Sequence, residues 1–295
     1  MADPPLLLAV PNVSEGRDLA AIRAIGAAFA PARLLDTHSD PDHGRTVFSL
    51  AARQGEIVDA LHSGAREALA RVDLRRGGGL HPHVGALDVA PVVFLAEDDR
   101  GAACAEALTA AALIGVDLDL PVFLYGDLAA AAGHRERAAL RAGGPARLAE
   151  RIASGELVPD HGPRRAHPGA GALLVTARPP LIAFNVDLAG ADAAIARAIA
   201  AELRESAAGG LPGVRAIGLY LPARGRAQVS FNVHDHRAVP LAEIVGRVRA
   251  RAEIAAAELV GLAPRAALDG FPADVPLRGF SPERHLIENA LRSVA

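Results

Sequence analysis

The chain has 295 residues, of which 51% are hydrophobic, 22% charged and 3% aromatic, and its formal net charge is -3 at pH 7. This length and composition allow one large domain or two smaller ones, and they exclude a disordered chain or a collagen-like fibre. No apolar stretch is long enough to span a bilayer, and the first ten residues lack the basic start of a signal peptide. We therefore expect a cytoplasmic protein with no membrane partner.

Cysteine and lysine usage excludes several kinds of chemistry. The chain contains one cysteine, Cys104, and no lysine, so a disulfide framework, a cysteine-rich metal site and Schiff-base catalysis are all excluded. The arginines are scattered and there are only two tyrosines, so the sequence offers neither a basic block nor a stacking surface for nucleic acid.

Short β-like runs alternate with longer alanine-rich stretches, which predicts an α/β fold. In the first half, strands are predicted at 6–10, 46–51, 89–95 and 122–125, and helices at 18–29, 56–72 and 101–114. In the second half, strands are predicted at 181–188, 214–221 and 227–234, and helices at 192–205, 241–258 and 283–291. Between these two series lies the Gly-, Pro- and Arg-rich segment 160–180. It is expected to join two lobes, residues 1–177 and 178–295.

Two histidines lie in the irregular segment 77–88, GGGLHPHVGALD, just ahead of a predicted strand. Loops at strand ends commonly carry catalytic groups, and an imidazole can both take and give a proton near neutral pH. His81 is therefore the candidate general acid or base, although an ordinary loop histidine fits the same pattern. Asp88, at the end of the segment, fits a turn or cap residue equally well.

Acidic, imidazole and guanidinium groups are mixed in the turn-prone segment 36–46, DTHSDPDHGRT. Such a mixture suits a ligand that carries both an amine and a carboxylate, because Arg45 can hold a carboxylate with two hydrogen bonds. A solvated polar loop explains the same composition.

The histidine spacing raises the question of a metal site. His81 and His83 lie two residues apart, as do His234 and His236, a spacing that puts both rings on one face of a strand. Three imidazoles with a carboxylate would suit zinc or iron. Pro82 interrupts the first pair and no longer ligand series follows, so we expect no metal.

Two further segments have a structural and a functional interpretation. Residues 11–18, PNVSEGRD, fit a helix cap, or a strand end from which Asn12 and Glu15 project into a cleft. Residues 162–171, GPRRAHPGAG, fit a plain linker, or a ligand channel lined by glycines and exposed backbone amides.

In chain order, these motifs resemble those of the glutamate formimidoyltransferase family. The segments that carry the resemblance extend over nearly the whole chain: PNVSEG at 11–16, HGRTV at 43–47, HPHVGALDV at 81–89, LPVFLYG at 120–126, LIAFNV at 181–186, AQVSFNV at 227–233, LVGLAP at 259–264 and FSPER at 280–284. The resemblance implies two α/β lobes, each with a ferredoxin-like sheet, with a folate tunnel between them, in a homodimer. It also implies transfer of a formimidoyl group between L-glutamate and the 5-nitrogen of tetrahydrofolate in histidine degradation.

The resemblance assigns roles to particular residues. The catalytic histidine of the family is the first of the HPxxGALD motif, here His81. Its folate-contacting stretch falls on ten consecutive residues: Gly162, Pro163, Arg164, Arg165, Ala166, His167, Pro168, Gly169, Ala170 and Gly171. We therefore expect tetrahydrofolate as co-substrate, and L-glutamate or formimidoylglutamate as the second ligand.

This sequence departs from the family pattern in three places. His83 stands where an arginine is usual, Gly44 stands where an asparagine is usual, and residues 167–169 lack the aromatic side chain often found there. Some animal members carry a cyclodeaminase domain after the transferase. This chain ends soon after FSPERHLIENAL, so we expect the stand-alone form.

Formimidoyl transfer breaks one C–N bond and forms another at an amidine carbon, through a cationic tetrahedral adduct. His81 can move the protons, Asp40 can stabilise the cation, and Arg45 can hold a substrate carboxylate, as can His83. Three alternatives stay open. They are another folate one-carbon transfer such as formyl from 5-formyltetrahydrofolate, a metal-dependent hydrolase that uses the paired histidines, and a folate-binding protein without turnover.

Overall fold

The computed structural model describes residues 3–77 and 79–293. The chain divides into two compact units, Met1–Pro179 and Pro180–Ala295, each with its own sheet and apolar core. The expected mixed α/β class with two lobes is thereby confirmed, and the units meet two residues beyond the expected boundary.

The sheet of the first unit follows a β-α-β-β-α-β plan. Its elements are β1 (Leu6–Ala9) with β2 (Asn12–Val13), α1 (Leu19–Ala28), β3 (Arg33–Asp40), β4 (Arg45–Arg53), α2 (Ile57–Arg71) and β5 (Leu87–Val93). Antiparallel pairing places β4 between β3 and β1, and β1 between β4 and β5, which is the ferredoxin-like order. Beyond β5 the sheet continues in parallel with β7 (Leu173–Arg178) and β6 (Val122–Leu124).

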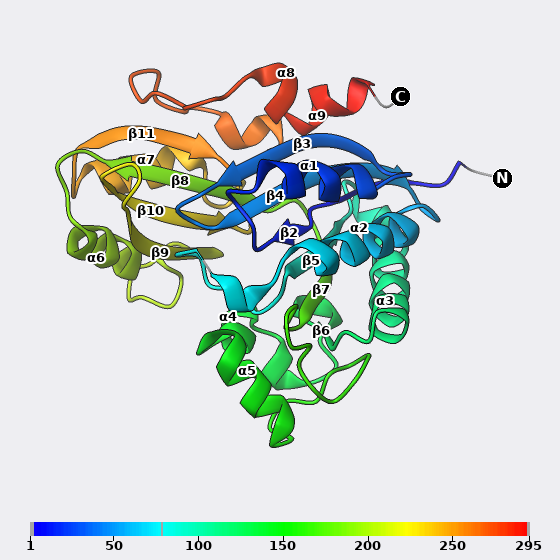
Figure 1. The fold of residues 1–295 in the computed structure, drawn as a ribbon. Helices are drawn as coiled ribbons and strands as arrows, with labels where there is room; N and C mark the ends of the chain where they lie inside the picture. The colour runs from blue at the N-terminus through cyan, green and yellow to red at the C-terminus, as the bar shows by residue number, and fades with distance from the viewer. Residues whose placement is uncertain (1–2, 78, 294–295) are drawn as a thin grey trace. The chain divides into compact units, whose positions relative to one another are not determined.

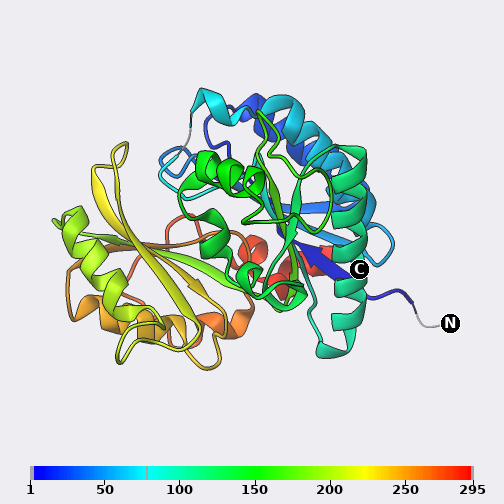
Figure 2. The same ribbon diagram turned by 90° about the horizontal axis from the view of Figure 1, so that it is seen from below.

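Helices cover the two faces of this sheet unequally. On one face, α1, α2 and α3 (Arg100–Asp117) bury apolar side chains in the larger core (Figure 1). On the other face, α4 (Arg137–Arg141) and α5 (Gly144–Ala153) pack over β6 and β7 in a smaller core, so the sheet lies between α3 and these two helices (Figure 2). Polar side chains of β3 and β4 share this second face.

The second unit follows the same β-α-β-β-α-β plan, without further strands in its sheet among the described residues. Its elements are β8 (Ile182–Leu188), α6 (Ala193–Leu203), β9 (Val214–Leu221), β10 (Arg226–Val233), α7 (Leu241–Arg249) and β11 (Ile254–Leu259). The antiparallel order β11-β8-β10-β9 is ferredoxin-like. Phe184 and Phe231 face the core with α6 and α7, and strand alternation turns Asn185 and Asp187 to the opposite face. The short helices α8 (Pro282–His285) and α9 (Ile287–Ala290) follow.

One expectation about the elements is wrong. The helix expected at 241–258 ends at Arg249, and Ile254–Leu259 forms β11, because pairing with β8 outweighs the helix propensity of three alanines. The segment 160–180, expected to join the lobes, contains the boundary between the units at Pro179 and Pro180, and it also contains the strand β7. Strand β3 was not predicted from the sequence, because aspartates are unusual in strands.

No helix in residues 3–77 or 79–293 is long and apolar enough to cross a bilayer.

Candidate active site

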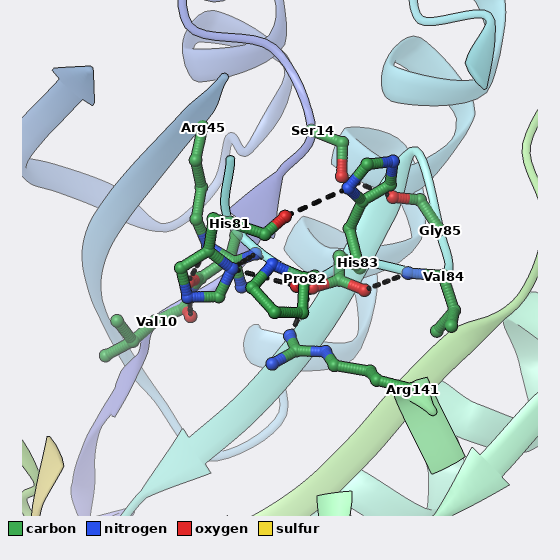
Figure 3. Close-up of polar contacts among 11 residues, drawn as sticks. Val10, Ser14, Arg45, His81, Pro82, His83, Val84, Gly85 and Arg141 are labelled. Carbon is green, nitrogen blue, oxygen red and sulfur yellow. Dashed lines mark hydrogen bonds and ion pairs between the residues drawn. The ribbon is translucent and has the colours of Figure 1, made fainter. Parts of the chain in front are cut away.

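Polar side chains from distant parts of the chain meet on the second face of the first sheet. Asn12 lies on β2, Arg45 begins β4, Asp88 lies in β5 and Arg141 ends α4. His81 lies in the loop before β5, beside Arg45, and Arg141 reaches the same group from α4 (Figure 3). These five side chains form the proton-transfer cluster.

A β-bulge directs Asp88 into this cluster. Asn12 pairs with Val89, and the next residue on β2, Val13, pairs with Leu87, so Asp88 is the extra residue on β5. A bulge bends its strand and re-aims a side chain, and bulges are frequent beside active sites. The irregular pairing therefore explains why a carboxylate points at Arg45 from a strand that is otherwise apolar.

The Asp88 carboxylate is 0% exposed and is paired with two guanidinium groups. Oδ1 accepts the Val84 N–H at 2.8 Å, and Oδ2 accepts Arg45 Nη1 at 2.9 Å and Arg141 Nη2. Burial raises the pKa of Asp88, but both guanidiniums and the Val84 amide outweigh it and hold the pKa below 3.8. Asp88 is thus a fixed negative charge that positions two cations.

Arg45 links this carboxylate to the histidine. Its Nε donates to Asn12 Oδ1 at 2.9 Å, and its Nη1 lies 2.9 Å from Asp88 Oδ2 and 2.9 Å from His81 Nδ1. Asn12 is itself held in place, because its Nδ2 donates to the Val10 carbonyl at 2.7 Å. Burial lowers the pKa of Arg45 and Asp88 opposes this. A guanidinium has no acceptor, so Arg45 donates to Asn12 and Asp88, and it donates to His81 Nδ1 only in the tautomer in which that nitrogen carries no proton.

His81 has its Nδ1 between a donor and an acceptor. The atom lies 2.9 Å from Arg45 Nη1 and 2.8 Å from the Pro82 carbonyl oxygen. If Nδ1 accepts from Arg45, the proton of the neutral ring sits on Nε2. If Nδ1 donates to Pro82, the Nε2 lone pair is available to take a proton. The second tautomer is the one that a general base requires.

The surroundings of His81 favour its neutral form. Burial lowers its pKa well below 6.5, and Arg45, Arg141 and His43 lower it further, while the bond to the Pro82 carbonyl opposes them. The ring centre of His43 lies 6.0 Å from that of His81. At neutral pH the imidazole is therefore an unprotonated base, and its protonated form returns the proton readily.

The loop that carries His81 is held against the turn before β4. The Leu80 and His81 N–H groups donate to the carbonyls of Asp42 at 3.0 Å and His43 at 3.3 Å. A Cβ added at Gly79 would lie 1.8 Å from the His43 carbonyl oxygen, so the close approach of the two segments requires glycine there. These backbone contacts hold the loop, and with it His81, against the turn before β4.

Two residues predicted for the substrate site make local contacts instead. His83 donates from Nδ1 to the His81 carbonyl at 3.1 Å, and its ring lies beside Ser14 and Gly85 rather than beside Arg45 (Figure 3). The Glu15 carboxylate accepts backbone N–H groups of the turn that leads into α1. Their predicted substrate contacts stay predictions.

Asp40 lies close to the proton-transfer cluster. It is buried, and it faces Arg45 in the register between β3 and β4. Its Oδ1 accepts the His43 N–H at 2.8 Å, which holds the turn between the two strands.

The end of the predicted folate stretch packs directly on the His81 loop. Gly171 pairs with Gly85, and the Ala86 N–H donates to the Ala170 carbonyl at 2.9 Å. His167 accepts the Ala170 N–H at 2.9 Å through Nδ1, so its ring closes the turn of the stretch.

The start of the stretch is more open. Arg164 is exposed, and Arg165, also exposed, pairs with Asp119. Gly162 has a left-handed φ of 79° and contacts Leu120, which anchors the stretch beside β6. The structure thus brings residues 167–171 next to the His81 loop and leaves the two arginines at the surface.

Sequence reasoning missed Arg141 and did not assign Asp88 to the site. Arg141 carries no motif, and the segment around it, RAALR, is an unremarkable helical turn. Among the described residues, no three His, Cys, Asp or Glu side chains gather as a metal site, and His234 and His236 lie in the second unit. That the protein needs no metal stays a prediction.

The site thus combines an imidazole with a buried guanidinium–carboxylate pair. The chain belongs to the formiminotransferase domain family. The family model described as the formiminotransferase domain, N-terminal subdomain, matches residues 6–178, and that described as the formiminotransferase domain matches residues 183–270. The predicted family membership is confirmed, and the chain is a member of a family of transferases.

Individual relatives cover the chain to different extents. It is 36% identical over 280 residues to the formimidoyltransferase-cyclodeaminase of Sus scrofa, an alignment that covers 89% of this chain and 51% of that protein. It is 33% identical over 292 residues to the glutamate formimidoyltransferase of Streptococcus pyogenes, covering 96% and 97%, and 32% identical over 302 residues to that of Thermoplasma acidophilum, covering 98% of each. The chain therefore spans about half the length of the cyclodeaminase relatives that it matches.

Proposed function

We propose that this protein is a glutamate formimidoyltransferase. It moves the formimidoyl group between N-formimidoyl-L-glutamate and the 5-nitrogen of tetrahydrofolate, with L-glutamate as the second product, in histidine degradation. The observation that carries the proposal is His81, the first histidine of HPHVGALD, which lies 2.9 Å from Arg45 and whose pKa is lowered by burial and then by Arg45 and Arg141. Two relatives of this name, similar over nearly the whole chain, support the substrate assignment.

The reaction needs one proton to change places. The 5-nitrogen of tetrahydrofolate attacks the amidine carbon, and the new C–N bond gives a tetrahedral adduct with an extra proton on that nitrogen. His81 Nε2 takes this proton and then gives it to the glutamate nitrogen, after which the C–N bond to glutamate breaks and the C=N bond re-forms. No oxidant or reductant takes part.

The contacts of His81 suit both halves of this exchange. In the tautomer whose Nδ1–H donates to the Pro82 carbonyl, the ring presents a basic Nε2. Once protonated, the ring lies beside Arg45 and Arg141, whose charges lower its pKa and favour return of the proton. Asp40 remains the candidate for stabilising the cationic adduct.

The direct test is incubation of the purified protein with N-formimidoyl-L-glutamate and tetrahydrofolate, with mass detection of both products. We expect 5-formimidoyltetrahydrofolate and L-glutamate in equal amounts. Formyl transfer from 5-formyltetrahydrofolate without formimidoyl transfer would replace the proposal with another one-carbon reaction. Folate binding without any product would leave a binding protein, and chelator-sensitive hydrolysis would indicate the hydrolase.

We further propose a cytoplasmic homodimer, which rests on the family resemblance. Sedimentation velocity of the purified chain tests the dimer: one species of twice the chain mass is expected, and a monomer at micromolar concentration would contradict it.

A further inference from the structure

Three hydrogen-bond donors next to the proton-transfer cluster are buried without an acceptor. They are Arg141 Nε, Arg178 Nε and the Tyr125 hydroxyl, none of which has a hydrogen-bond partner among the described residues. Tyr125 is 8% and Arg141 7% exposed, so water outside the protein does not satisfy them. A buried polar group left unpaired costs about 1–3 kcal/mol, which folded proteins rarely accept without a functional reason.

The sheet brings these donors together on one face. Tyr125 directly follows β6, and Arg178 is the last residue of β7, the strand next to it. The Tyr125 N–H donates to the Val175 carbonyl at 3.0 Å, and Thr176 Oγ1 donates to the Tyr125 carbonyl at 2.8 Å, which fixes the tyrosine against β7. Arg141 approaches the same face from α4.

Tyr125 and Arg137 act electrostatically on all three arginines of this region. Tyr125 raises the pKa of each of the three arginines Arg45, Arg141 and Arg178, and Arg137 lowers all three. Burial is the largest effect and brings the pKa of Arg141 to about 9 and that of Arg178 to about 10. All three side chains are therefore cations at neutral pH, grouped around one phenol.

Positive charge exceeds negative charge here. Asp88 is paired with Arg45 and Arg141, whereas Arg178 donates from Nη1 to a backbone carbonyl, that of Pro179, at 2.9 Å. Buried charges are ordinarily paired, so a ligand anion is the partner that this group lacks. Guanidinium groups match the planar two-oxygen edge of a carboxylate.

We propose that Arg178, Arg141 and Tyr125 form a carboxylate subsite that binds one carboxylate of the formimidoyl donor. The inference rests on the proposed function, and it names the part of the site that selects acidic donors. Three donors suit the two oxygens of a carboxylate, which offer about four lone-pair positions. Arg45, whose donors serve Asn12 and Asp88, then positions His81, while the subsite holds the substrate.

The test is calorimetric titration of the folded protein with three ligands: L-glutamate, glutarate and n-butylamine. Glutarate keeps both carboxylates but has no amine, and n-butylamine has an amine but no carboxylate. Each titration is run with and without saturating 5-formyltetrahydrofolate. The variants are Arg178→Met and Tyr125→Phe, and the matched control is Arg66→Met, an exposed arginine that pairs with Asp117. Circular dichroism confirms that each variant is folded.

We expect wild type and Arg66→Met to bind L-glutamate and glutarate but not butylamine. Arg178→Met should weaken both acids by about tenfold or more, and Tyr125→Phe by roughly threefold to tenfold, since each loses a hydrogen bond to a charged group. Affinity for 5-formyltetrahydrofolate should stay unchanged in both. If Arg178→Met fails to fold, Tyr125→Phe decides the matter.

The outcomes separate this inference from the proposed function. If wild type turns over formimidoylglutamate but neither variant loses affinity for the acids, the subsite is wrong and the function stands. If wild type shows no turnover but the variants lose glutarate binding, the function is wrong and the subsite stands. Inorganic phosphate that displaces glutarate in wild type but not in Arg178→Met would overturn the assignment to a carboxylate.

Discussion

The two units share one plan, but the polar side chains on the helix-free part of each sheet are paired differently. In the second unit, Gln228 donates to Asp187 at 2.8 Å, and Arg278 pairs with Asp187 at 2.9 Å and with Glu258 at 3.4 Å. In the first unit, Asp88 holds two guanidiniums while further donors lack an acceptor among the described residues. Asp187 Oδ2 has an ion pair but no hydrogen bond, so the second unit pairs its charges, whereas the first unit leaves donors of two guanidiniums and a phenol without an acceptor among the described residues.

The comparison predicts that catalysis depends on the first unit's network. His81→Ala should fold normally and lose activity by about 10²–10⁴, the usual contribution of a general acid–base residue. The matched control is His236→Ala, a partly buried histidine of the second unit, which should keep its activity. Initial rates and circular dichroism check both variants. Equal rates in wild type and His81→Ala would remove His81 from the mechanism.

Stability should respond most strongly where one carboxylate serves two buried cations. Asp88→Asn leaves Arg45 and Arg141 without their counter-charge, so we expect a loss of about 3–5 kcal/mol in the free energy of unfolding. Asp187→Asn removes one of the two carboxylate partners of a partly exposed guanidinium, that of Arg278, so a loss of about 1–3 kcal/mol is expected. Urea unfolding measures both. A larger loss at Asp187 would reverse the comparison.

The pH dependence of kcat/KM should report the lowered pKa of His81. Activity requires the neutral ring, so the acidic limb should lie below pH 6.5, and Arg45→Gln should move it upward because a cationic neighbour is lost. The free energy of unfolding should also decrease as the pH is lowered. Between the folded pKa and 6.5 the unfolded chain binds more protons, so stability falls as pH falls through this window. His81→Ala should abolish that slope, and an unchanged slope would assign it to another group.

The smallest effect is expected at the surface. Arg165→Ala removes an exposed pair with Asp119, so the free energy of unfolding should change by less than about 0.5 kcal/mol. If Arg165 meets the glutamate tail of folate, as the predicted folate stretch implies, affinity for polyglutamated folate should still fall. Titration with mono- and polyglutamated folates checks this, and equal affinities in wild type and variant would exclude the contact.

The sequence predicted the parts of the molecule that depend on local pattern. The alternation of strands and helices and the position of His81 are local features, and both Asn12 and Arg45 lie in motifs that the resemblance covers. The bulge at Asp88 was not predictable, because it arises from pairing between β2 and β5, strands separated by the whole α1–α2 region.

Two other features could not be predicted from the sequence for the same reason. Arg141 meets Asp88 across 53 positions of sequence, and nothing in RAALR marks it as a partner. The three alanines of β11 favour a helix locally, and only pairing with β8 makes them a strand. Tertiary contacts, rather than local preference, determined each of these outcomes.

The central claim is that burial, together with the cationic network of the first unit, keeps His81 a neutral base. The most direct measurement is an NMR titration of the His81 ring, with nitrogen shifts that report its tautomer. The account predicts a midpoint well below 6.5 with the proton on Nδ1, and an upward shift in Arg45→Gln. A midpoint at or above 6.5 in wild type, or a proton on Nε2 of the neutral ring, would contradict it.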